Sequence, residues 1–315
     1  MTDTPLHVVL GTGQVGLALT ERLTALGLHV RAVSRGRAAG LPDSVDWRSA
    51  DLTDTEAARD AVKGASVVYQ CLNVPYTRWP ELFPPLQAAV VDAVQHAEAL
   101  LVSLENVYGY GPLAGRPMTE DLPLAATTTK GQVRVAMTRD LQAAYDAGLL
   151  RMTIGRASDF FGPRVTESTL GSRVFAHALE GKRVDFIGNP TLLHTYSYVP
   201  DMAAGLATLG TDERSVGQVW HLPGPETVTT RAVFDLLATD VRHEVKVRNV
   251  APLMLRAMGL VNPMMRELAE MSYEFDQPFV LDTSKYENTF GAMGTPLATA
   301  VADTVAWYRT DASQV

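Results

Sequence analysis

Short apolar runs alternate with amphipathic stretches of helical length along the first half of the chain. The apolar runs have the length of strands and span residues 7–10, 29–34, 66–71, 99–103 and 150–155. The stretches between them place apolar residues at helical spacing, over residues 14–26, 54–62, 82–97 and 130–147. Strands that alternate with helices predict a parallel sheet covered on both faces. Right-handed crossovers then give a doubly wound, Rossmann-type α/β fold.

The alternation breaks after Arg156. Phe160–Pro163 and Gly188–Pro190 are typical of loops. Beyond them we expect one helix and two short strands, over residues 201–209, 219–222 and 245–250. We therefore expect two parts. Residues 1–155, with 196–222 returning to the sheet, would form a dinucleotide-binding domain, and residues 156–195 and 223–315 a smaller, interleaved C-terminal substrate lobe.

A glycine-rich turn follows the first predicted strand. Its sequence, Gly11-Thr12-Gly13-Gln14-Val15-Gly16, has the spacing G-x-G-x-x-G between a strand and a helix. The first glycine allows a tight turn, the second lets the backbone approach a pyrophosphate, and the third lets helix and strand pack closely. The helix N-terminus adds amide donors and a partial positive charge. The turn therefore predicts a dinucleotide site.

The residue that reads the cofactor's ribose is expected about 20 positions further on, at the end of the second strand. An Asp or Glu there would bind a 2′-hydroxyl, but this sequence has Ser34 and Arg35. A hydroxyl and a guanidinium suit a 2′-phosphate, which favours NADP over NAD, although NAD is possible. Arg35 could also be a solvated loop charge.

Four further residues complete the predicted cofactor site of the first half of the chain. Asp51 and Leu52 follow a short third strand and could contact the adenine edge, although Asp51 could equally cap the next helix. Leu72 and Asn73 follow the strand that ends at Cys71. All four would lie at the carboxyl edge of the sheet, where open α/β sheets bind ligands.

Composition and charge narrow the class of protein. The chain has 315 residues, 46% of them hydrophobic and 20% charged, as in packed globular proteins. Its net charge of -8, without a basic cluster, makes nucleic acid an improbable partner. No apolar run reaches the roughly 18 residues of a membrane span. The single cysteine, Cys71, fits a reducing cytoplasm, and the seven histidines lack ligand spacing, so we expect no metal site.

Taken together, these residues resemble the extended short-chain dehydrogenase/reductase superfamily, in its NAD-dependent epimerase/dehydratase-like branch. Besides the glycine turn and Asp51-Leu52, the resemblance runs through residues 106–109, 156–163 and 194–201. It implies a Rossmann-type domain with a small substrate lobe, a nicotinamide cofactor and often a homodimer. It also implies that the segment 157–160, beginning with Ala157, passes close to the nicotinamide.

The usual catalytic residues of that superfamily are replaced here. Its members use a Ser or Thr together with a Tyr and a Lys spaced Y-x-x-x-K. In this sequence Lys130 stands in the place of the Tyr, Arg134 in that of the Lys, and Leu104 in that of the Ser or Thr. The proton donor is therefore expected to be non-standard.

Three residues are candidates for that chemistry. Lys130 could act as an acid, because partial burial beside Arg134 would lower its pKa, or it could bind the cofactor's ribose or phosphate as a fixed cation. Glu105 could act as a base, or cap a loop. Tyr108 could protonate an oxyanion, or pack as an aromatic side chain.

We therefore expect an NADP(H)-dependent oxidoreductase that acts on a small carbonyl or hydroxyl compound. One alternative is an epimerase or dehydratase that recycles its nicotinamide in place. Another is a non-catalytic dinucleotide sensor resembling the NmrA-like proteins. In each case we expect a small-molecule ligand, neither nucleic acid nor membrane as a partner, and a cytoplasmic homodimer.

Overall fold

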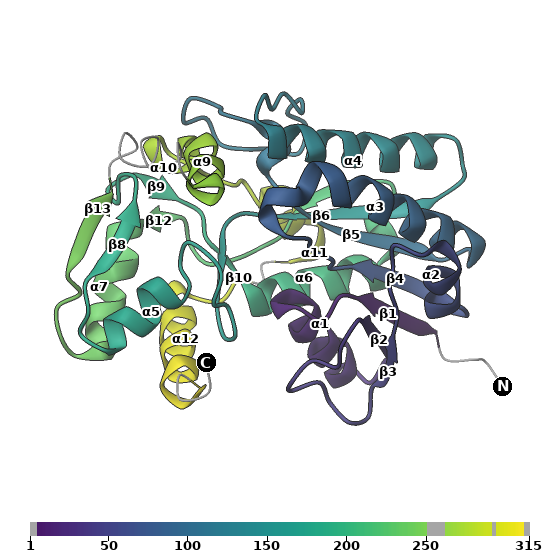
Figure 1. Cartoon of the computed structure of the whole chain (residues 1–315), viewed down its shortest axis with the longest axis horizontal. Helices are drawn as coiled ribbons and strands as arrows, with labels where there is room; N and C mark the ends of the chain where they lie inside the picture. The colour runs from purple at the N-terminus through teal and green to yellow at the C-terminus, as the bar shows by residue number, and fades with distance from the viewer. Residues whose placement is uncertain (1–4, 251–261, 292–293, 312–315) are drawn as a thin grey trace.

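A parallel seven-stranded sheet forms the centre of the molecule (Figure 1). The computed structural model describes residues 5–250, 262–291 and 294–311. From one edge of the sheet to the other the strands are β11 (Val219–His221), β6 (Arg151–Ala157), β5 (Leu100–Asn106), β4 (Ala65–Gln70), β1 (Leu6–Leu10), β2 (His29–Ser34) and β3 (Asp46–Ser49). Every neighbouring pair is parallel. The predicted doubly wound α/β fold is confirmed.

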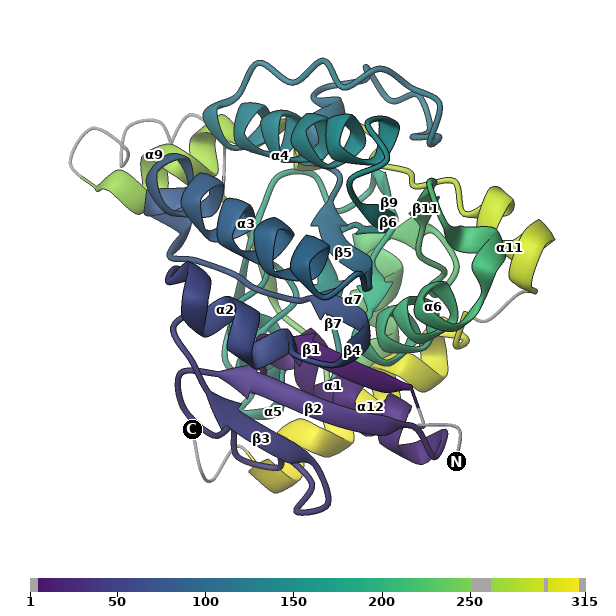
Figure 2. The same ribbon diagram turned by 90° about the vertical axis from the view of Figure 1, so that its right-hand side faces the viewer.

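Helices cover both faces of the sheet, as Figure 2 shows. On one face lie α2 (Thr55–Val62), α3 (Trp79–His96) and α4 (Thr129–Asp146), and on the other α1 (Gln14–Ala25) and α6 (Val199–Thr211). Successive side chains of β1 point to opposite faces of the sheet. Val8 and Leu10 pack in the core under α2, α3 and α4, and Val9 packs in the core under α1 and α6. These three adjacent residues of a central strand are all apolar because both faces of the sheet are buried.

A smaller lobe packs beside the sheet domain (Figure 1). Its own core joins α5 (Ser172–Leu179), α7 (Thr230–Val241) and α12 (Leu297–Asp311) to the parallel pair β8 (Val184–Ile187) and β13 (Val247–Val250). Two shorter pairs adjoin it: β7 (Phe160–Phe161) with β10 (Ser197–Tyr198), and β9 (Leu193–His194) with β12 (Val228–Thr229). Helix α9 (Pro263–Glu270) contacts the start of α4 and is followed by the short helix α10 (Tyr273–Asp276). Helix α11 (Ser284–Phe290) packs near β11. Of the lobe residues expected over 223–315, those at 251–261, 292–293 and 312–315 lie outside the described part.

Element boundaries differ from the prediction in a few places. Helix α3 begins at Trp79 instead of residue 82, because Pro80 lies in the first turn, where a missing N–H costs nothing. Phe160–Pro163, expected to be a loop, contains the two-residue strand β7. A three-residue helix, η1 (Tyr76–Arg78), precedes α3, and a second, η2 (Tyr108–Tyr110), follows β5. Over the described residues, none of the helices is long and apolar enough to cross a membrane.

Candidate functional site

Glycines shape the turn between β1 and α1. Gly11 has a φ of +92°, and a Cβ added there would lie 2.7 Å from the carbonyl oxygen of Cys71. A Cβ at Gly16 would lie 1.9 Å from the carbonyl oxygen of Gly11. At Gly13 an added Cβ would have no atom of the described residues within 4 Å. Glycine is thus required at the first and third positions by the protein itself, whereas at Gly13 it leaves the backbone open to a ligand.

The start of α1 is available to an anion. Gly13 is the N-cap residue and supplies no side-chain hydrogen bond to the helix. The first amides of a helix, here those of Gln14, Val15 and Gly16, lack carbonyl partners one turn earlier. The neighbouring Thr12 hydroxyl is turned to the end of β2, where it donates to Ser34 at 2.9 Å. The amides and the helix dipole together suit a pyrophosphate.

The end of β2 carries the two residues predicted to read the ribose. The Ser34 hydroxyl accepts hydrogen bonds from Thr12 and from the Trp47 indole, at 3.1 Å, and donates to the Gly36 carbonyl. Ser34 is therefore held by the protein's own groups. Arg35 is exposed and lies close enough to Asp51 to lower the pKa of that carboxyl, after the larger effect of hydrogen bonds from Thr53. Its guanidinium is accessible to a ligand.

The other predicted cofactor residues lie where β3, β4 and β6 end. Asp51 is exposed and accepts a hydrogen bond from its neighbour Thr53, whereas the Leu52 side chain is buried in the core under α2 and α3. Leu72 lies next to the turn, with its Cδ2 3.2 Å from the Cβ position of Gly11. The remaining two differ in exposure, since Asn73 is exposed and Ala157 is buried at the end of β6.

Lys130, in the first turn of α4, is almost completely buried and ion-paired. Only 1% of its surface is exposed, and its Nζ binds the carboxylate of Glu267 on α9. The ammonium also lies over the ring of Tyr76, 4.0 Å from the centroid, and 6.0 Å from that of Trp79. We expected partial burial beside Arg134, but a carboxylate and two aromatic rings surround the ammonium instead.

Arg134, one turn further along α4, is buried between aromatic rings. Its guanidinium carbon lies 4.7 Å from the ring of Trp79 and 4.4 Å from that of Phe83. Within the described part of the chain its Nε has no hydrogen-bond partner, and burial lowers its pKa. A guanidinium remains protonated even so, which excludes it as a proton donor.

Helix α9 holds the start of α4 at a second point. The Glu270 carboxylate accepts a hydrogen bond from the backbone amide of Thr129, while the Thr128 hydroxyl accepts one from the amide of Gly131. Two carboxylates from the C-terminal lobe, those of Glu267 and Glu270, therefore meet the positive end of α4. Such carboxylates stabilise a helix N-terminus.

Glu105 belongs to a buried polar network between the sheet and α4. Its carboxylate accepts hydrogen bonds from Arg156 at 3.2 Å and from Thr138 at 3.0 and 2.9 Å. Arg156 also donates to the Tyr110 hydroxyl, which lies 2.7 Å from His221. Both carboxylate oxygens face Thr138 under α4, so the geometry favours a structural ion pair over the role of base that we expected for Glu105.

Tyr108 contacts the same two aromatic side chains, Tyr76 and Trp79, that surround Lys130. Its ring stacks on Trp79, with 5.9 Å between centroids, and its hydroxyl is hydrogen-bonded to that of Tyr76. Burial raises the pKa of both phenols, so both are protonated at neutral pH. Lys130, Tyr76, Trp79 and Tyr108 thus form one cluster, from which Glu105 is separate.

The C-terminal lobe brings three more polar groups near this cluster. Asp159, in the segment between β6 and β7, is 3.0 Å from Nε2 of His194, whose ring stacks on Phe275 and Phe279. Glu274 on α10 is 98% buried, and in the described structure its Oε1 has no hydrogen-bond partner. Burial, reinforced by the negative charge of Asp159, raises the pKa of Glu274 well above its usual value.

The carboxylates of the lobe were not among the site residues predicted from the sequence. Glu267 and Glu270 are three residues apart, the spacing of one helix face, which could have indicated them. Glu274 continues that spacing in the sequence but lies on a separate helix, α10. Asp159 lies inside the segment that the resemblance already placed near the nicotinamide. Nothing in the local sequence of the glutamates indicates which surface they meet.

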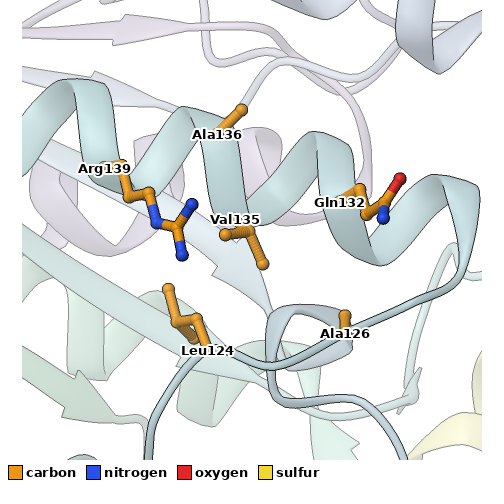
Figure 3. A pocket seen from close by; sticks show the side chains of 6 residues that line it. All are labelled: Leu124, Ala126, Gln132, Val135, Ala136 and Arg139. Atoms are coloured by element: carbon orange, nitrogen blue, oxygen red, sulfur yellow. The ribbon is translucent and has the colours of Figure 1, made fainter.

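A hollow of about 290 Å³ opens on the outer face of α4 (Figure 3). Its lining residues are Leu124, Ala126, Gln132, Val135, Ala136 and Arg139. The four of these residues that belong to α4 lie on the side of the helix opposite to Lys130 and Arg134, and Leu124 and Ala126 precede the helix, so the hollow is separate from the cluster. The described residues contain no group of His, Cys, Asp and Glu able to hold a metal ion.

Solved structures of known proteins have the same fold. dTDP-glucose 4,6-dehydratase from Bacillus anthracis, in complex with NAD, has a TM-score of 0.82 and 15% identity, covering 98% of each chain. UDP-glucuronic acid 4-epimerase from Bacillus cereus, also in complex with NAD, has a TM-score of 0.79 and 16% identity, covering 97% of this chain and 99% of that one. At these identities the likeness establishes the architecture alone.

Sequence comparison extends the likeness. A dTDP-glucose 4,6-dehydratase from Streptomyces griseus is 24% identical over 218 residues, which cover 69% of this chain and 61% of the relative. The match thus spans less than two thirds of that protein's length. The model of the NAD dependent epimerase/dehydratase family matches residues 8–222, from β1 to just beyond β11. This match covers more than half of the chain and confirms the resemblance: the chain belongs to the NAD-dependent epimerase/dehydratase family.

Proposed function

We propose that the chain is an enzyme that binds a nicotinamide dinucleotide and uses it to oxidise a hydroxyl group of its substrate transiently, as an epimerase or a dehydratase does. The open backbone at Gly13, before the uncapped start of α1, is the observation that carries this function. Family membership supports this reading more than the net reduction of a small carbonyl compound, which we expected from the sequence.

The residues present fit such a cofactor. The amides of Gly11–Gly16 would hold the pyrophosphate, and Ser34 and Arg35 would meet the adenosine ribose. The other candidates follow strand ends along the same edge of the sheet: Asp51, Leu52, Leu72, Asn73 and Ala157. When bound, the nicotinamide supplies a group that accepts and returns a hydride. A position near Ala157 would bring the nicotinamide toward Lys130 and Tyr108.

For the cofactor we propose NADP in preference to NAD. The exposed guanidinium of Arg35 supports a 2′-phosphate, and β2 ends without the carboxylate that would repel one. The structural relatives named above are complexes with NAD, so NAD is the alternative. Parallel titrations with NADPH and NADH decide between them, and tighter binding of NADH would contradict the assignment to Arg35.

We propose that Lys130 acts as a fixed cation and not as the proton donor. Its Nζ is already bound by Glu267 and enclosed by Tyr76 and Trp79. An ammonium held in this way can attract the cofactor's ribose or a substrate oxygen without losing its proton. Lys130→Arg should therefore keep most of the turnover, whereas Lys130→Met should lose it. Equal losses in the two variants would contradict a purely electrostatic role.

The decisive experiment combines cofactor binding with turnover. We expect the purified chain to bind dinucleotide saturably and to convert a sugar nucleotide such as dTDP-glucose without net accumulation of reduced cofactor. Mass spectrometry distinguishes the reactions, because dehydration removes one water whereas epimerisation leaves the mass unchanged. Steady accumulation of the reduced cofactor would indicate the net oxidoreductase instead. Absence of any dinucleotide binding would overturn the function.

A dinucleotide sensor is the second candidate. The observation that favours it is the ion pair of Lys130 with Glu267, in the place where family members carry the reactive tyrosine. A sensor should bind oxidised and reduced cofactor and turn over no compound of a carbonyl and sugar-nucleotide panel. Turnover of any member of the panel, abolished by Gly13→Val, would exclude this role.

We also propose that the chain is a cytoplasmic homodimer. The family resemblance supports the dimer, and the single cysteine supports a reducing compartment. Burial raises the pKa of the Cys71 thiol to about 12, which leaves it unreactive. Light scattering of the purified chain tests the dimer, and a monomeric mass would contradict it.

A further inference from the structure

Glu274 is a buried carboxyl group for which the described part of the chain supplies no side-chain hydrogen bond. It lies on the short helix α10, is 2% exposed, and leaves Oε1 without a partner among the described residues. An ionised carboxylate in such surroundings costs several kcal/mol, so the group is held protonated. Burial of an unpaired acid destabilises a fold and therefore calls for a reason beyond stability.

Its surroundings connect Glu274 to the cluster at α4. The next residue, Phe275, stacks on His194 with 5.2 Å between centroids, and His194 in turn lies 3.0 Å from Asp159. Burial raises the pKa of Tyr76 and Tyr108, and the charge of a nearby ionised Glu274 would raise it further. Those two phenols are hydrogen-bonded to each other and are only partly buried. Their exposed surface is accessible to a substrate, whereas the Glu274 carboxyl is not.

Other charged and titratable groups of this region are already engaged. Lys130 pairs with Glu267, Glu270 accepts from the amide of Thr129, and Asp159 contacts His194. Tyr273, beside Glu274, is a phenol whose pKa burial raises. Glu274 is therefore the carboxyl of this set that carries a proton and lacks a fixed partner.

We infer that Glu274 stores the proton that the site exchanges with its substrate, and that Tyr108 and Tyr76 carry this proton between them. An acid of the C-terminal lobe would thus take over the task for which α4 lacks its tyrosine. This role rests on the proposed function, because it requires a nicotinamide ring near Ala157. It assigns Glu274 as a positioning residue that acts through the two phenols.

The chemistry balances with Glu274 as the store. In the oxidation the substrate's C–H bond would break, and its electron pair would leave with the hydrogen as a hydride, which a bound nicotinamide would accept. The O–H bond breaks as well, and its proton passes through Tyr108 and Tyr76 to the Glu274 carboxylate. The carbon–oxygen double bond forms as both leave. The return reaction restores hydride and proton to the substrate.

The charge of a bound nicotinamide would determine whether Glu274 is protonated or ionised. An oxidised nicotinamide carries a positive charge, which favours the Glu274 carboxylate, so binding of NAD⁺ should release a proton. A reduced nicotinamide is neutral and should leave the carboxyl protonated. The carboxylate would therefore be present when a hydroxyl is to be oxidised, and the acid when a carbonyl is to be reduced.

Titration calorimetry of the full chain tests this coupling without a substrate. NAD⁺ and NADH are the probes, because neither has the 2′-phosphate, which itself titrates near pH 6. Binding measured in buffers of different ionisation enthalpy gives the number of protons exchanged. We expect NAD⁺ to release a fraction of a proton, up to one per site, and NADH to release none. Glu274→Gln, which mimics the protonated acid, should abolish the release and retain binding.

Matched variants test whether a neighbouring group, and not Glu274, is the source of the released proton. Glu267→Gln and Tyr108→Phe should retain the release, because they leave the store intact. Release that survives in Glu274→Gln, or that is equal for NAD⁺ and NADH, would contradict the role of Glu274 while leaving the dinucleotide site established. Failure of both probes to bind would instead contradict the proposed function.

A measurement on the unaltered chain covers the case in which Glu274→Gln fails to fold. Proton release requires the affinity for NAD⁺ to rise with pH, by up to about tenfold per pH unit, since binding and ionisation are linked. The affinity for NADH should stay level over the same range. Parallel pH profiles for the two forms would overturn the inference.

Discussion

The turn after β1 and the start of α4 both face the edge of the sheet where the strands end, yet they are built differently. Backbone geometry makes the turn: Gly11 and Gly16 fit where no other residue does, and their neighbours are main-chain oxygens. Side chains make the start of α4, where Lys130 meets Glu267 and two aromatic rings.

This difference explains why the glycine turn keeps the residues typical of the family, whereas the start of α4 does not. A backbone site tolerates no substitution at its tight positions, because a Cβ would enter the main chain itself. A site built of side chains can exchange one set of groups for another if charge and volume are compensated. At α4 the compensation comes from a different part of the chain, the acids of α9.

The largest effect should come from Gly16→Ala. A Cβ there would lie 1.9 Å from a backbone oxygen, so we expect a loss of about 4 kcal/mol or more in the free energy of unfolding, or failure to fold. The control is Gly13→Ala, whose Cβ enters open space. It should change stability by less than about 1 kcal/mol and weaken dinucleotide binding at least tenfold. Denaturant titration and cofactor binding check both, and equal losses of stability would contradict the division of roles.

The network under α4 should give the next largest effect. Glu105→Ala leaves the buried guanidinium of Arg156 unpaired, which should cost about 3–5 kcal/mol in the free energy of unfolding. Glu213→Ala removes an exposed partner of Arg151 and should cost less than about 1 kcal/mol. Denaturant unfolding of the two variants measures the difference. Similar losses would show that burial does not distinguish the two ion pairs.

The same network should make the fold sensitive to acid. Burial lowers the pKa of His221 to about 3, so the folded chain disfavours the proton that the unfolded chain binds below about pH 6.5. This contribution to stability is therefore intact above pH 6.5 and decreases as the pH falls toward 3, by about 2 kcal/mol at pH 5. Denaturant unfolding at pH 5 and pH 7 measures it. His221→Gln should flatten the dependence, whereas the exposed His243→Gln should leave it unchanged.

The smallest effect is expected at Arg35, the side chain predicted to bind the cofactor's 2′-phosphate. Arg35→Ala should weaken NADPH binding about tenfold, equivalent to about 1.4 kcal/mol, with little change for NADH. Arg37→Ala is the control, because that guanidinium folds back toward Asp43. Fluorescence titration with both cofactors measures the four affinities. An equal loss for NADH in Arg35→Ala would indicate a contact that does not involve the 2′-phosphate.

The sequence predicted what depends on local pattern and backbone. The strand His29–Ser34 and the parallel, doubly covered sheet follow from apolar runs whose lengths and spacing are explicit in the chain. The glycine turn likewise follows from steric rules that hold for any sequence. The replaced residues Lys130 and Arg134 could be recognised by position. Their partners could not, because Glu267 is 137 residues away from Lys130 and pairs with it through tertiary structure alone.

The late return of α6 to the sheet has a consequence for synthesis on the ribosome. Leu19 and Leu23 of α1 are fully buried in a core that includes Leu206 and Leu209 of α6, roughly 185 residues later. At about 5–20 residues per second, the newly made helix would wait roughly 9 to 37 seconds for the helix that covers it. During that interval its apolar side is free to associate with other nascent chains, so yield in the cell should depend on chaperones that shield the first helix.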